Sequence, residues 1–339
     1  MQLLYAGIDL HSTNNYVGII DEEDRRVLEK KLPNDLDTIF HYLNPFKEDL
    51  VGVVVESTFN WYWLVDGLMK NDYTVHLANP SAIKQYEGLK YTDDKWDSFW
   101  LAHMLRLNIL PEGYIYPMQE RPLRDLLRKR LKLVREKTAH ILSLKSMFSR
   151  NLGITITSNN IEALKKEYVE GKLTQPHLIM AAQASICTMQ TLMKHIQIIE
   201  KEVMSKISLR RPFQCLLSVP GIGNILALTI MLEVGDISRF KAVGQYSSYC
   251  RCVTTKRLSN GKRKGKGNVK NGNKHLAWAY TEAANFAKRH CPYARSFYQR
   301  KAKQGGTVLA IKALSNKLSR ATYYIMRDHI EYDPKMLFG

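Results

Sequence analysis

The chain has 339 residues, which is long enough for two or three domains with hydrophobic cores of their own. Hydrophobic residues make up 45% of it and charged residues 24%, the balance of a folded globular protein. No apolar run reaches the roughly 18 residues of a membrane span, and the opening MQLLYAGIDLH lacks the pattern of a signal peptide. The five scattered cysteines are typical of reduced thiols. We therefore expect a cytoplasmic protein without a membrane partner.

Charge is distributed very unevenly along the chain, whose net charge is +18. Residues 1–118 contain 10 Lys and Arg against 18 Asp and Glu, a net charge of −8, which leaves 40 against 14, or +26, for residues 119–339. Basic surface attracts phosphate backbones through Coulomb steering and counterion release. An excess of lysine that only maintains solubility is a weaker explanation of such an imbalance. The second part is therefore predicted to bind nucleic acid.

The first third alternates the patterns of strands and helices. Short apolar or alternating runs predict strands at residues 3–10, 16–20, 26–32, 50–55 and 73–78. Helical spacing predicts helices at residues 36–43, 61–70, 80–89 and 93–107. A three-stranded meander followed by helix, strand, helix, strand and helix is the order of a ribonuclease H-like α/β fold. We predict such a domain over residues 1–118.

The remainder is predicted to be mainly helical. After a turn-rich linker at 111–122, a long basic amphipathic helix is expected over 123–152 and a second over 178–207. Two such helices indicate a coiled-coil arm, assigned to residues 119–210. A mainly α domain follows over 211–339, with helices expected near 216 and over 225–234, 243–250, 275–288 and 308–329.

Four acidic residues of the first third fall where such a sheet gathers metal ligands. Asp9 ends the first strand, Glu56 ends the valine-rich fourth, and Asp94 and Asp97 share a helix face because they are three residues apart. Each has an ordinary alternative as a turn residue or as an acid near a helix start. Their combination is more specific, and Glu56 is costly to bury without a partner. The quartet is predicted to be catalytic and to bind Mg²⁺ for phosphoryl transfer.

Two motifs of the basic part offer chemistry. The segment Pro220-Gly221-Ile222-Gly223 has two equally supported interpretations. It is either a phosphate-binding turn at a helix start or a plain tight turn between two helices. Residues 254–274 contain eight Lys and Arg, four glycines and no acid, as a nucleic-acid loop or a disordered linker would. Ser259 lies there beside Arg257, Lys262 and Arg263. These cations would stabilise negative charge on the phosphorus oxygens if its hydroxyl attacked a phosphodiester, which makes Ser259 a candidate nucleophile. Its rivals are Ser247, Ser248, Thr254 and Thr255.

The basic side chains expected to contact nucleic acid lie on the first long helix and in this loop. They are Arg124, Arg128, Arg130, Arg135, Arg257, Lys262, Arg263, Lys264, Lys266 and Lys270. Cys250 and Cys252 form a lone C-x-C without a second pair, so ordinary cysteines are favoured there over a zinc site.

These motifs together resemble those of the insertion-sequence-110 family of transposases and the related Piv-type DNA invertases, over nearly the whole chain. The matching stretches are residues 7–9, 55–58, 92–97, 101–102, 217–223, 233–240, 259–262 and 270–276, with the basic helix at 123–152. Two positions depart from the family pattern. Ser98 stands where an alanine usually follows the last acid, and Asn260 stands where a glycine often follows the serine.

The resemblance implies a RuvC-like domain whose Asp-Glu-Asp-Asp quartet binds Mg²⁺, and a C-terminal transposase domain whose serine, here Ser259, forms a covalent link to DNA. It also implies a homo-oligomer, from dimer to tetramer, in which different protomers complete one active site. A non-coding bridge (seeker) RNA would pair with donor and target DNA. Such an enzyme would work on the nucleoid of a bacterium or archaeon.

Two other functions remain open on the residues alone. A hydrolytic RuvC-like nuclease would use water as the nucleophile and leave Ser259 a bystander. A basic scaffold that packages RNA or DNA would use no catalysis, which the intact quartet argues against. The first hypothesis is therefore a site-specific DNA recombinase of a mobile insertion sequence.

Overall fold

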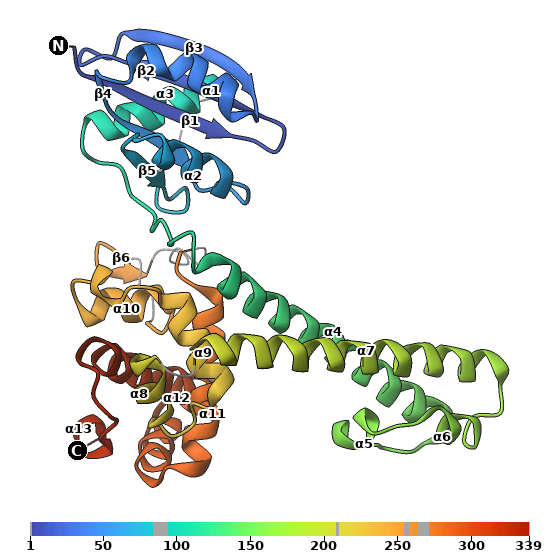
Figure 1. Ribbon diagram of the computed structural model, residues 1–339. Helices are drawn as coiled ribbons and strands as arrows, with labels where there is room; N and C mark the ends of the chain where they lie inside the picture. The colour runs from blue at the N-terminus through green and yellow to red at the C-terminus, as the bar shows by residue number, and fades with distance from the viewer. Residues whose placement is uncertain (1, 84–93, 208–209, 254–257, 264–270, 339) are drawn as a thin grey trace. The chain divides into compact units, whose positions relative to one another are not determined.

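The computed structural model describes residues 2–83, 94–207, 210–253, 258–263 and 271–338 (Figure 1). For residues 94, 95, 258, 259 and 263 it describes the backbone alone. The chain divides into two compact units, Met1–Met118 and Gln119–Gly339. Among the described residues, no helix is both long and apolar enough to cross a bilayer.

The first unit is built on a mixed five-stranded sheet in the order β3-β2-β1-β4-β5. Its strands are β1 (Leu4–Leu10), β2 (Asn14–Ile20), β3 (Arg26–Pro33), β4 (Leu50–Glu56) and β5 (Val75–Ala78). The first three strands form an antiparallel meander, and β4 lies parallel to both β1 and β5. The predicted α/β character of this part is confirmed.

Helices cover both faces of this sheet. The 3-10 turn η1 (Asn44–Phe46) follows α1 (Leu36–Leu43), and α2 (Tyr62–Lys70) and α3 (Asp94–Arg106) complete the unit. Successive side chains of a strand point to opposite faces. Val53 and Val55 accordingly pack with α1 and α2, whereas Val54 packs against α3. The valine run of β4 is therefore buried on both faces, as its lack of alternation predicts.

One predicted helix of this unit differs in the structure. Residues 80–83, the start of the helix expected over 80–89, form a turn. Pro80 begins this segment two residues after the end of β5, and the backbone N–H groups of Ala82 and Ile83 donate to the Asn79 oxygen, which closes a turn there. Residues 84–89 lie outside the described part of the chain.

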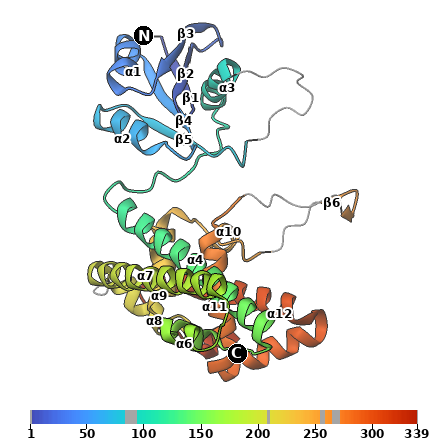
Figure 2. The same cartoon turned by 90° about the vertical axis from the view of Figure 1, so that its right-hand side faces the viewer.

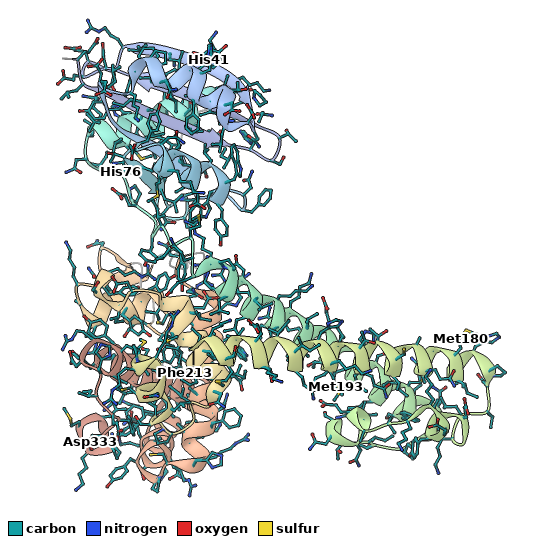
Figure 3. All side chains as sticks on the ribbon, viewed as in Figure 1. His41, His76, Met180, Met193, Phe213 and Asp333 are labelled. Carbon is teal, nitrogen blue, oxygen red and sulfur yellow. The ribbon has the colours of Figure 1, made fainter. Side chains whose placement is uncertain are left out.

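The second unit begins with an arm of two long helices, α4 (Arg121–Leu152) and α7 (Pro176–Ile207) (Figures 1 and 2). Leu144 and Phe148 of α4 pack with Ile186 and Met189 of α7, all fully buried. Helix α4 ends at Gly153, whose φ of 67° is the left-handed conformation that glycine adopts most easily. Two short helices missed by the sequence reasoning, α5 (Ser158–Glu162) and α6 (Lys166–Glu170), cover this core. Met180, in the first turns of α7, is 70% exposed (Figure 3).

The rest of the unit is a helical body around α9 (Asn224–Val234), whose residues from Leu226 onward are all buried. A helix that is apolar on every side has to be enclosed by others. The surrounding elements are α8 (Arg211–Leu217), with buried Phe213 (Figure 3), η2 (Ile237–Arg239), α10 (Val243–Tyr249), α11 (Lys274–His290), α12 (Pro292–Asp328) and α13 (Pro334–Phe338). The predicted mainly helical second part is confirmed.

The last long helix extends further than the sequence pattern predicted. The helix expected over 308–329 is the second half of α12, which starts at Pro292 and is interrupted at Gly306, with φ 83° and ψ 168°. The Gly305-Gly306 pair breaks the helical periodicity, so the first half was not predicted. A two-stranded hairpin, β6 (Leu258–Ser259) and β7 (Lys262–Arg263), was also missed (Figure 2).

Candidate active site

Asp9 and Glu56 lie next to each other because their strands are parallel neighbours. Ile8 of β1 pairs with Val55 of β4, so the next residue of each strand, Asp9 and Glu56, emerges at the same edge of the sheet. Polar side chains at the carboxyl ends of adjacent parallel strands converge in this way. Asp9 is only 4% exposed, and its carboxylate accepts a hydrogen bond from the Glu56 carboxyl group when Glu56 is protonated. The carboxyl groups of Asp9 and Glu56 are therefore adjacent at a site with little access to water.

Helix α3 brings Asp97 to the same edge. The helix passes so close to β1 that a Cβ on Gly7 would overlap the backbone oxygen of Ser98. The absence of a side chain at Gly7 thus sets the approach of α3, and Asp97 precedes the point of closest contact. Asp97 and Glu56 line one hollow of about 250 Å³, together with Pro80, Ile83, Trp100 and Leu101. The structure therefore places Asp9 beside Glu56, and it places Asp97 in the lining of a hollow that Glu56 also lines.

The fourth acid, Asp94, is the first residue of α3, one helical turn before Asp97. Its side chain lies outside the described part of the structure. The expectation that both aspartates share a face remains a prediction.

The negative charge of Asp9 disfavours ionisation of Glu56. Burial, followed by the hydrogen bond and negative charge of Asp9, raises the pKa of Glu56 to about 7, and nearby His11 opposes that rise. The His11 imidazole Nε2 lies 3.0 Å from Asp9 Oδ2. Because ionisation of Glu56 beside Asp9 is unfavourable, a cation next to the two carboxyl groups would be stabilised.

This arrangement fits a divalent metal in its donor chemistry. Mg²⁺ prefers oxygen ligands and is commonly held by one or two carboxylates. Among the described side chains, no group of three or more His, Cys, Asp or Glu is already arranged as a metal cage. Asp9 and Glu56 supply the adjacent oxygen atoms, and Asp97 lines the same hollow as Glu56.

His11 is a residue of this site that sequence reasoning did not single out. It follows β1 directly, and its backbone oxygen accepts hydrogen bonds from the side chains of Asn34 and Asn60, both at 3.0 Å. These two amides fix the turn after Asp9 and thereby the position of the imidazole. The only signal in the sequence was its spacing of two residues from Asp9.

Ser259 is the last residue of β6, beside a two-residue turn. Asn260 and Gly261 both have positive φ, 49° and 72°, which is the backbone of a type I′ hairpin turn. Asn-Gly is the strongest sequence signal for that turn, so Asn260 in place of a glycine suits the hairpin. Ser259 pairs with Lys262, whose side chain is exposed. The side chain of Ser259 itself lies outside the described part.

Its rival hydroxyls differ in accessibility. Ser247 is 1% exposed and accepts a hydrogen bond from Ser319 at 3.3 Å, inside the helical body. Ser248 is exposed on α10. Thr254 and Thr255 lie outside the described residues.

Close packing requires a glycine at one of the two glycine positions in the turn between α8 and α9, Gly221. Gly221 has φ 94°, and a Cβ there would lie 2.5 Å from the backbone oxygen of Ala283 on α11. Gly223 has open space around it and precedes the first residue of α9. The close contact with α11 favours the plain helix–helix turn over a phosphate site.

Three of the four arginines predicted on α4 to bind nucleic acid are paired with an acid or buried within the protein. Arg128 pairs with Glu233 at 2.6 Å, Arg130 pairs with Glu200 at 2.7 Å, and Arg124 is 8% exposed. Arg135 is exposed. The periodic pattern of an amphipathic helix distinguishes its faces but does not reveal acids that approach from other helices.

The basic loop is described only at its hairpin and its ends. Lys262 is exposed, and Arg263 is described by its backbone in β7. Arg257, Lys264, Lys266 and Lys270 lie outside the described residues. Their contacts with nucleic acid remain predictions.

Comparisons with known proteins agree over both units. Residues 6–151 match the DEDD-type IS110 model described as Transposase, and residues 213–299 match the model described as Transposase IS116/IS110/IS902 family. A probable family 20 transposase of Pseudomonas aeruginosa is 23% identical over 98% of this chain and its own whole length. An uncharacterized 43.6 kDa protein of insertion element IS110 from Streptomyces coelicolor is 26% identical over 37% of this chain and 31% of its own. The family-model match over residues 6–151 contains all four predicted acids, and the match over residues 213–299 contains Ser259. On this evidence the chain belongs to the IS110 family of transposases.

Proposed function

We propose that this transposase is a site-specific recombinase in which the acids of the first unit bind Mg²⁺ and Ser259 attacks a DNA phosphodiester. The observation that carries the proposal is the convergence of Asp9 and Glu56 at one sheet edge, with Asp97 facing the same hollow. A buried carboxylate next to a half-buried one destabilises the folded state unless a cation balances their charge.

The topology of the first unit supports a ribonuclease H-like, RuvC-like assignment. The meander β1–β3, with β4 and β5 added in parallel on the far side of β1, matches the element order expected from the sequence. The acids sit at the ends of β1 and β4 and on α3, the places predicted for the quartet.

The proposed chemistry balances without an outside energy source. The Ser259 hydroxyl loses its proton and forms an O–P bond, while the P–O bond to the leaving nucleotide breaks and that oxygen takes up a proton. A hydroxyl of another strand end then attacks the phosphoserine, which restores the serine and joins the DNA. A bound Mg²⁺ would supply stabilisation of the negative charge on the reacting phosphate. Asp9, Glu56 and Asp97 would hold it, with Asp94 as the fourth ligand.

Guidance by a non-coding RNA and a dimeric to tetrameric assembly complete the proposal. A net charge of +26 over residues 119–339 suits a large RNA and two DNA duplexes, whose backbones and shapes are read largely without base contacts. The long helices α4 and α7 offer an arm through which copies of the chain would associate. Sequence-specific recombination by purified protein free of RNA would contradict the RNA requirement.

A denaturing gel tests the central step. The protein is incubated with Mg²⁺, the DNA end of its element and the adjacent non-coding RNA, and wild type is compared with Ser259→Ala and Asp97→Ala. We expect a slowly migrating protein–DNA adduct in wild type alone. Ser248→Ala is compared as well, because Ser248 is the exposed rival hydroxyl of the same region, and the proposal expects this variant to form the adduct.

A hydrolytic nuclease is the alternative that the same gel separates. The hollow between Glu56 and Asp97 would also admit a water molecule as the nucleophile. Cleaved DNA without an adduct, formed equally by Ser259→Ala, would establish that reaction and overturn the serine mechanism.

A further inference from the structure

The described residues on either side of the stretch that carries Ser259 are hydrogen-bonded to each other, and these bonds form the base of the stretch. The backbone N–H of Asn273 donates to Tyr249 O at 2.6 Å, and Arg251 Nε donates to the carbonyls of Asn271 and Gly272 at 2.9 and 3.1 Å. Gly272 has φ 86°, and a Cβ there would lie 2.7 Å from the same Tyr249 oxygen. The two chain segments that flank residues 254–270 are thus bonded directly to each other.

Asn273 links this base to the first turn of α11. Its side-chain oxygen accepts hydrogen bonds from the backbone N–H groups of His275 and Leu276, at 2.8 and 3.1 Å, which caps the helix. Its side-chain nitrogen donates to Glu233 Oε2 at 2.7 Å. The backbone N–H, the side-chain oxygen and the side-chain nitrogen of this one residue are therefore all used at the junction.

Glu233 connects the junction to the arm. It is 3% exposed in the otherwise apolar helix α9, and Arg128 of α4 donates to both of its oxygens, at 2.6 and 2.7 Å. Despite burial, which acts in the opposite direction, the bonds from Arg128 and Asn273 lower the pKa of Glu233. Burial of an ionised carboxylate costs desolvation free energy, even when it is fully hydrogen-bonded. Packing alone does not require it, since an apolar residue of the same size would fill the space.

We propose that Glu233 is a positioning residue for Ser259. Together with Arg128 and Asn273, it fixes the base of the serine-bearing stretch relative to helix α4. In the sequence Glu233 lies 105 residues after Arg128 and 40 residues before Asn273. The inference rests on the proposed role of Ser259. It assigns to Glu233 no contact with DNA; the carboxylate acts through Asn273.

The substitution Asn273→Asp tests this link with little other change. It keeps the side-chain oxygen that caps α11 but replaces the donor to Glu233 with a second carboxylate. We expect the initial rate of protein–DNA adduct formation to fall roughly 10- to 100-fold, as displaced catalytic groups do, while affinity for the element's end duplex stays within about twofold. Hydrogen exchange at the Asn273 amide should quicken.

Adding Glu233→Gln to Asn273→Asp should rescue both readouts, because it restores a donor opposite the new acceptor. Glu200→Gln is the matched control: it breaks the other Arg–Glu pair of α4, that of Arg130, far along the sequence from the serine stretch. An unchanged adduct rate in Asn273→Asp, an equal loss in Glu200→Gln, or no rescue would overturn the inference. A wild type without any adduct would instead contradict the serine chemistry, and the exchange at Asn273 would still test the link.

Discussion

At the scale of single residues, Glu56 determines how the acidic site responds to pH when no metal is bound. Its folded pKa of about 7 lies above the ordinary 4.5 because burial and Asp9 favour the protonated form. The folded chain therefore holds more protons than the unfolded chain between these values, and this contribution to stability is lost as pH rises through that window.

The variant Glu56→Gln should remove this dependence. In EDTA, its melting temperature relative to wild type should be higher at pH 8 than at pH 5, because the amide cannot ionise beside Asp9. Differential scanning calorimetry measures the difference. Glu48→Gln, at an exposed glutamate of the same unit, is the control, and an equal shift in both variants would refute the assignment.

The same acids should make the first unit sensitive to Mg²⁺. A ligand that binds only the folded state stabilises it by RT ln(1 + [L]/Kd), about 2.7 kcal/mol at a hundredfold excess over Kd. We expect Mg²⁺ to raise the melting temperature of wild type and to have little effect on Asp9→Asn, which removes a charge from the pair. If the two proteins gained equally, the cation would be bound elsewhere.

At the scale of elements, two glycines of one turn should behave differently. Gly221→Ala combines a left-handed φ of 94° with overlap against α11, and should cost about 2 kcal/mol or more. Gly223→Ala has open space and an ordinary φ of −91°, so its effect should stay within about 1 kcal/mol. Urea unfolding of the two variants provides the comparison, and similar losses would disprove the packing argument.

Elements with a strong local pattern could be predicted from the sequence, and long-range pairs could not. The strand ends at Asp9 and Glu56 followed from periodicity and from the order of elements. The hairpin beside Ser259 had a local signal, Asn260-Gly261, that was overlooked within a basic loop. The pairing of Arg128 with Glu233 had none, because the partners are 105 positions apart and nothing in a helical pattern names the acid that a helix will meet.

At the scale of the whole molecule, the charge of +26 over residues 119–339 should be visible as salt dependence of nucleic-acid binding. Each phosphate neutralised by a lysine or arginine adds close to one to the slope of log affinity against log salt. Not every arginine contributes, since some are held by acids of the protein itself.

Arg135 and Arg130 offer the sharpest comparison, because both lie on α4 and only the first is exposed. Arg135→Gln should lower the slope for a short duplex by about one, whereas Arg130→Gln should leave it nearly unchanged because its guanidinium already holds Glu200 at 2.7 Å. Fluorescence anisotropy of the full chain across a series of NaCl concentrations measures both slopes. Equal reductions would mean that Arg130 exchanges Glu200 for phosphate on binding, and that internal ion pairs do not limit which cations reach nucleic acid.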